Sequence, residues 1–105
     1  MQIRIVTDNH IEGSERREEY YTEVINQKLK RFEDNITDIE IHLADENSSS
    51  KSGSDDKRCT IEVHISGKKP MAVTNHADTV EKSINGAIEK LKHLLEHTFD
   101  KMRTY

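Results

Sequence analysis

Apolar residues in the last quarter of the chain recur at steps of three and four, the spacing of one face of an α-helix. The pattern predicts one helix over residues 78–105, with Asp78 as N-cap and Glu81 completing a capping box. Its predicted inner face consists of Val80, Ile84, Ala87, Ile88, Leu91, Leu95, Thr98 and Met102. A second stripe, which we call the cationic ridge, lies on the roughly opposite side and consists of Lys90, His93, His97 and Lys101.

Other segments alternate between apolar and polar residues, which is typical of half-buried β-strands. The clearest alternation runs from Lys57 to Ser66, with Cys59 and Ile65 among the inward positions. Because the alternate positions are polar, the sheet should be covered on one side only and be largely antiparallel. The predicted strands are residues 2–6, 36–43, 57–66 and 70–74.

A first helix is predicted over residues 14–32, with Ser14 as N-cap and acidic residues in the first turn. Its inner face is Tyr21, Ile25, Leu29 and Phe32. Residues 45–56 contain no apolar side chain and are predicted to form a flexible hairpin loop. The order strand, helix, three strands, helix predicts one α+β domain over residues 1–105. Its architecture is two-layer β-α-β-β-β-α, a four-stranded sheet with two helices packed on one face.

Composition narrows the function classes. The chain has 105 residues, of which 34% are charged and 32% hydrophobic, enough for one modest core. A formal net charge of −4 argues against a protein that is basic all over, but it allows a local basic patch. One cysteine rules out an internal disulfide, and no apolar run approaches the length of a membrane span. The N-terminus reads as a strand and not as a signal peptide, so we expect a cytoplasmic protein.

Strings at core positions throughout the chain resemble the short ribosome hibernation-promoting factors, also called ribosome-associated inhibitor or sigma-54 modulation proteins. The resemblance covers essentially the whole chain, and the joint spacing of these positions carries it. The matching residues are Lys28, Leu29, Phe32, Asp34, Ile36, Ile39, Ile41, Leu43, Ile61, Glu62, Val63, Ala72, Asp78, Ile84, Asn85, Gly86, Ile88, Glu89, Lys90, Leu91 and Leu95.

The resemblance implies a translation inhibitor without enzymatic activity or cofactor. Such a domain sits between the head and body of the small ribosomal subunit, obstructs the messenger and transfer RNA sites, and holds idle ribosomes. The family binds rRNA phosphates with Lys and Arg on its two helices. The chain ends after its second helix, so we expect a monomer that lacks the C-terminal dimerisation domain of the long family members.

The candidate rRNA-binding residues are Lys28, Arg31, Lys90, His93, His97 and Lys101. Positions 93 and 97, where the family tends to carry Lys or Arg, are His here, and position 99 is Phe. Each neutralised phosphate would release counterions and make binding sensitive to salt. The alternative is an acidic protein-interaction module on the same fold, without rRNA binding.

Three other features carry possible chemistry and have simpler explanations. The string from His93 to His97 matches the H-x-x-E-H pattern of inverted zinc proteases, but few residues remain for a third ligand, so no metal is expected. Cys59 lies at an inward strand position and is expected to be a small buried side chain. Glu40, Glu62 and His64 share the outer sheet face, where solvated cross-strand pairs are expected rather than acid–base catalysis.

Overall fold

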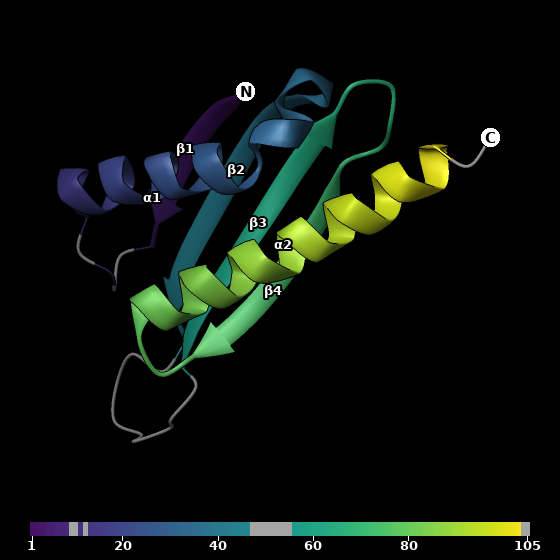
Figure 1. The fold of residues 1–105 in the computed structure, drawn as a ribbon. Coiled ribbons are helices and arrows are strands. Elements are labelled where there is room, and N and C mark those ends of the chain that lie inside the picture. The colour runs from purple at the N-terminus through teal and green to yellow at the C-terminus, as the bar shows by residue number, and fades with distance from the viewer. Residues whose placement is uncertain (9–10, 12, 47–55, 104–105) are drawn as a thin grey trace.

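The computed structural model describes residues 1–8, 11, 13–46 and 56–103, with residues 101–103 described by their backbone alone. The first strand, β1, is followed by a helix and a short 3₁₀ segment, then by three strands and a long second helix (Figure 1). The elements are β1 (Gln2–Thr7), α1 (Glu15–Lys28), η1 (Lys30–Asn35), β2 (Ile36–Asp45), β3 (Lys57–Ile65), β4 (Met71–Ala77) and α2 (Val80–Arg103).

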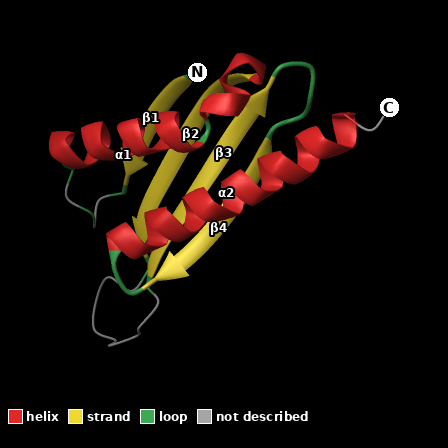
Figure 2. Ribbon diagram, in the orientation of Figure 1, coloured by secondary structure: helices red, strands yellow, loops and turns green. Residues whose placement is uncertain are grey.

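The four strands form one sheet in the order β1-β2-β3-β4. β1 runs parallel to β2, whereas β2 pairs with β3 and β3 with β4 in antiparallel fashion. The parallel pair requires a crossover, and α1 provides it. Both helices cover the same face of the sheet (Figure 2), which confirms the predicted two-layer α+β fold.

Strand register explains why one sheet face is apolar. Ile41 of β2 pairs with Ile5 on one side and Ile61 on the other, and Ile61 pairs in turn with Val73. Because side chains alternate along a strand, such rows face the helices together. The helices contribute most of the predicted inner faces, and the buried members are Tyr21, Ile25, Leu29, Phe32, Ile84, Ala87, Ile88, Leu91 and Leu95. Val80 and Thr98 are half-buried, and the side chain of Met102 lies outside the described residues.

The end of the first helix differs from its prediction. The α-helical part stops at Lys28, and the chain continues as the 3₁₀ segment η1. The Leu29 N–H still bonds to Ile25 O at 2.9 Å, but the Phe32 N–H bonds to Leu29 O at 2.9 Å, an i to i−3 contact. This tighter winding keeps Phe32 buried, so the apolar spacing continues although the helix type changes.

The predicted start of α2 is wrong by one residue. Thr79, and not Asp78, caps the helix, because its Oγ1 accepts the Lys82 N–H at 3.1 Å. The Asp78 carboxylate instead lies 3.2 Å from Lys82 Nζ, and the predicted capping box does not form. The Ser14 cap of α1 is confirmed, since its Oγ accepts the Arg17 N–H at 3.1 Å.

The predicted hairpin loop falls largely on residues 47–55, which lie outside the described residues. The segment is closed by the Glu46 N–H, which donates to Asp56 O at 2.8 Å. That pair continues the β2–β3 ladder beyond Asp45 and Lys57. The flexibility of the loop therefore stays a prediction.

Gly86 marks the closest approach of α2 to β4. A Cβ placed there would lie 2.2 Å from Asn75 Nδ2 and 2.7 Å from Asn75 Cγ. The same Asn75 amide faces the Lys82 and Ser83 carbonyl oxygens of α2, at 3.4 and 3.3 Å. Packing against Asn75, and not backbone conformation, therefore favours glycine at this position.

This close approach predicts non-additive mutants. In the wild-type chain Gly86→Ala should be neutral or destabilising, because the displaced Asn75 amide offsets the helix-propensity gain of about 1 kcal/mol. In an Asn75→Ala background the same change should stabilise the protein by up to about 1 kcal/mol. Urea unfolding of the four members of this cycle measures the coupling, and strict additivity would contradict the packing described here.

The inner face of α2 should be the most sensitive part of the core. Leu91 has no exposed surface, so Leu91→Ala should lower the free energy of unfolding by about 2–5 kcal/mol through lost transfer energy and a cavity. His93→Ala, an exposed change on the same helix, is the matched control and should shift it by less than about 0.5 kcal/mol. A loss below about 1 kcal/mol for Leu91→Ala would contradict the assignment of this face.

Candidate nucleic-acid interface

The cationic ridge lies on the side of α2 that faces away from the core. His93 and His97 are exposed, and so is Lys90. Lys90 extends toward the edge of the sheet, where its Nζ donates to Thr74 O of β4 at 2.8 Å. Lys101 lies within α2, and its side chain is outside the described residues. The described part of the ridge is thus a solvent-facing stripe beside the β4 edge.

Lys28 and Arg31 come from the first helical segment, by which we mean α1 together with η1. They lie on the other side of α2 from the β4 edge. Lys28 Nζ lies 2.5 Å from Glu89 Oε2, and Arg31 Nη2 lies 3.9 Å from Glu96 Oε2. Both carboxylates belong to the flank of α2 that faces α1. Arg31 is also held over the Phe32 ring, with its guanidinium carbon 4.5 Å from the ring centroid.

The structure therefore places the five described candidates in two groups, and Lys101 lies outside this comparison. Two consecutive residues of α2 contact different neighbours: Glu89 contacts Lys28 of α1, whereas Lys90 contacts β4. In Figure 1, α2 runs between α1 and the outer edge of the sheet. Lys28 and Arg31 form one group, and the described ridge residues form another.

Three ion pairs, which we call the inter-helix pairs, join the first helical segment to α2 within the described residues. They are Arg17–Glu81 at 3.8 Å, Lys28–Glu89 at 2.5 Å and Arg31–Glu96 at 3.9 Å. In each pair the cation comes from the first segment and the carboxylate from α2. The hydrogen bond from Lys28 lowers the pKa of Glu89, so this carboxylate stays ionised. Exposed pairs of this kind stabilise a fold by at most about 1 kcal/mol each.

Two further lysines, which the sequence did not identify as candidate rRNA-binding residues, lie near the ridge. Lys68 and Lys69 are exposed in the turn between β3 and β4. Met71, at the start of β4, accepts a contact from Thr98 Oγ1 of α2 at 3.9 Å to its Sδ. The turn therefore lies at the same end of the molecule as the C-terminal turns of α2 (Figure 1). A Gly-Lys-Lys-Pro string was visible in the sequence, but its position beside α2 follows only from the register of β4.

The uncovered sheet face carries paired polar groups, but two of its histidine–carboxylate contacts lie within one strand and not across strands as expected. Glu62 Oε1 lies 2.9 Å from His64 Nε2, and this hydrogen bond is the main cause of a raised His64 pKa. Glu40 contacts His42 at 3.0 Å and pairs with Arg4 of β1. Those contacts, the His42 bond first, lower the Glu40 pKa, which is opposite to what a general acid needs.

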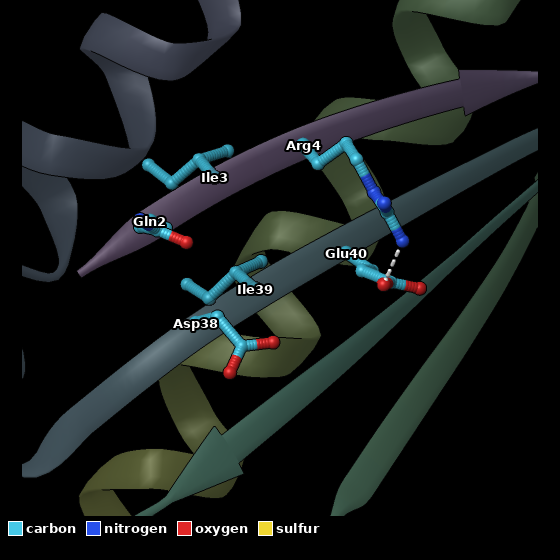
Figure 3. A pocket seen from close by; sticks show the side chains of 6 residues that line it. All are labelled: Gln2, Ile3, Arg4, Asp38, Ile39 and Glu40. Atoms are coloured by element: carbon cyan, nitrogen blue, oxygen red, sulfur yellow. Dashed lines mark hydrogen bonds and ion pairs between the residues drawn. The ribbon is translucent and has the colours of Figure 1, made fainter.

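A shallow pocket of about 490 Å³ opens between β1 and β2 on the sheet (Figure 3). Figure 3 shows the Arg4–Glu40 pair bridging the two strands there. The pocket is lined by Gln2, Ile3, Arg4, Asp38, Ile39 and Glu40. Arg4 and Glu40 are paired with each other, and the pocket is open to water, so it is not an enclosed site for a reaction.

A sequence model of the family described as sigma 54 modulation protein / S30EA ribosomal protein matches residues 4–103. The chain belongs to this family. The family is one of ribosome-associated factors and not of enzymes, in agreement with the resemblance seen in the sequence. No curated protein matches the chain.

Solved structures show the same fold. The N-terminal domain of Protein Y from Thermus thermophilus aligns with a TM-score of 0.67 and 19% identity, over 93% of this chain and 99% of that one. A ribosomal subunit interface protein from Coxiella burnetii aligns with a TM-score of 0.68 and 18% identity, over 95% and 99% of the two chains. At such identities the likeness establishes the architecture of the chain.

Among the described residues, no three His, Cys, Asp or Glu side chains gather as metal ligands. Glu96 of the H-x-x-E-H string lies beside Arg31. No described helix is both long and apolar enough to cross a bilayer.

Cys59 lies in the core without exposed surface, and burial raises the pKa of its thiol to about 12. At pH 8 only about one thiol in 10⁴ is then a thiolate, the reactive form. We expect Cys59 in the native protein to react with a thiol reagent orders of magnitude more slowly than in urea, as followed by chromophore release. Stoichiometric labelling of the native protein within seconds would show that β3 is more accessible than described.

Proposed function

We propose that this protein is a ribosome hibernation factor that binds rRNA of the small ribosomal subunit through cationic side chains on its helical face. The observation that carries the proposal is the family match over residues 4–103. The printed descriptions of the two structural neighbours, one of them a ribosomal subunit interface protein, are consistent with it. The proposed place of action is the cytoplasm, where ribosomes are.

The cationic ridge is the primary contact of the proposed complex. Lys90, His93 and His97 are exposed on α2, and Lys68 and Lys69 extend positive charge beyond the β4 edge. Such side chains position a protein on RNA by contacting phosphates, without reading sequence. Inhibition would be stoichiometric: the bound domain occupies space that messenger and transfer RNA need, as the family resemblance implies.

Lys28 and Arg31 are the secondary contact. They reach solvent, with 45% and 59% of their side chains exposed, although each is paired with a carboxylate. A phosphate approaching α1 competes with Glu89 and Glu96 for these cations. The ridge is therefore expected to contribute more to affinity than the first helical segment does.

Sedimentation with purified small subunits is the direct test. The protein should pellet with the subunits at about 0.05 M salt and be partly released at about 0.2 M, because bound phosphates exchange with counterions. A monomeric chain should bind with one-to-one stoichiometry. Failure to pellet at low salt and at pH 6 would contradict the proposal.

The second candidate function is an acidic interaction module that has lost rRNA binding. The inter-helix pairs favour it, because they neutralise Arg17, Lys28 and Arg31, and the net charge of −4 is consistent with it. This module would bind a protein partner in ribosome-free extract and stay in the supernatant with purified subunits. The sedimentation test separates the two candidates.

Because the cationic ridge contains two histidines, we expect binding to the small subunit to depend on pH. Histidine gains charge as the pH falls through 6–7, and a phosphate partner favours the charged form. Affinity for small subunits should therefore rise as the pH falls from about 7.5 to 6, and the salt slope should steepen by roughly one to two units. Sedimentation at both pH values with a salt titration measures this.

Two variants test the origin of the pH effect. His93→Ala with His97→Ala should remove most of it and leave the fold intact, because both side chains are exposed. Lys90→Glu should weaken binding to a similar extent at every pH and serves as the control. Identical pH profiles for the wild type and the double-histidine variant would show that the histidines do not contact rRNA.

A further inference from the structure

The inter-helix pairs share one direction, with every cation on the first helical segment and every carboxylate on α2. Arg17 differs from the other two, because only 20% of its side chain is exposed. Lys28 and Arg31 lie open to solvent, three positions apart at the end of the segment. A ligand approaching these two cations would find each already paired with a carboxylate of α2, Lys28 with Glu89 and Arg31 with Glu96.

Carboxylate and phosphate oxygens are interchangeable partners for ammonium and guanidinium groups. The Lys28 ammonium donates a charge-assisted hydrogen bond to Glu89 Oε2, and the lowered pKa of Glu89 agrees with it. Arg31 is fixed on the Phe32 ring, and Phe32 stacks on Phe99 of α2 at 5.2 Å between centroids. The aromatic stack thus holds the guanidinium beside the helix that carries Glu96.

We infer that Glu89 and Glu96 are specificity-determining residues of the RNA surface, which occupy the phosphate positions of Lys28 and Arg31 and so restrict binding to RNA able to displace both carboxylates. This inference rests on the proposed function. An isolated phosphate or a flexible single strand gains little from displacing one carboxylate, since one ion pair is lost for each one formed. Phosphates held close together by a folded RNA displace both at once and add their contacts to those of the ridge.

The test compares Glu89→Gln/Glu96→Gln with Glu19→Gln/Glu23→Gln. The second variant removes the same charge from exposed positions of α1 outside the inter-helix pairs. Poly(U) is the flexible single-stranded probe, and binding is measured by fluorescence anisotropy across a salt titration. Circular dichroism establishes that both variants fold.

We expect Glu89→Gln/Glu96→Gln to bind poly(U) about two- to five-fold more tightly for each pair removed, relative to the control variant. Its salt slope should steepen by about 0.7 per uncovered cation, the value for single strands. Adding Lys28→Gln/Arg31→Gln should abolish the gain, which shows that it passes through these two cations. A purely structural role of the pairs would alter thermal stability and leave the salt slope unchanged.

Equal gains in the two charge-matched variants would overturn the inference, because bulk charge would then explain the effect. A gain that survives Lys28→Gln/Arg31→Gln would overturn it as well. Sedimentation of the wild type with small subunits tests the proposed function separately. Wild-type binding without a poly(U) gain removes only the inference, and a poly(U) gain without wild-type binding removes only the proposed function.

Discussion

Burial of one sheet face beneath both helices is the constraint on which the rest of the molecule depends. Strand register aligns the inward side chains in rows, such as Ile5, Ile41, Ile61 and Val73, and only that face needs cover. Two helices laid side by side on the same face must present flanks to each other. The surface on which the proposed function depends is therefore divided into the inter-helix pairs and an outer stripe beside β4.

Helix geometry then determines what each flank carries. Consecutive residues are about 100° apart around the helix axis, so Glu89 and Lys90 serve opposite flanks although they are neighbours in the sequence. One contacts Lys28 and the other contacts Thr74 O of the edge strand. The chain can therefore be acidic overall and still carry a basic stripe. Three carboxylates of α2 face the first helical segment and not the stripe: Glu81, Glu89 and Glu96.

The sequence predicted the parts of this structure that depend on periodicity. The four strands, both helices and their inner faces follow from apolar spacing, since burial requires that spacing. The exact start of α2 was harder to predict, because Asp78 and Thr79 can both cap a helix. Only the hydrogen bond from the Lys82 N–H to Thr79 shows that Thr79 is the cap. The change from α1 to η1 at Leu29 was missed for a related reason, because Phe32 stays buried in either winding.

The candidate site could be predicted residue by residue but not as a surface. Exposure of Lys90, His93 and His97 follows from their spacing against the apolar stripe. The pairing of Lys28 with Glu89 joins residues 61 positions apart, and no periodicity reports on such a contact. The place of Lys68 and Lys69 likewise requires the register of β4 under α2. Glu89 and Glu96 both reach solvent, whereas the apolar residues of α2 that face the sheet do not. A change at either carboxylate would therefore leave the core intact and would alter both the charge of α2 and the availability of a cation on the first helical segment.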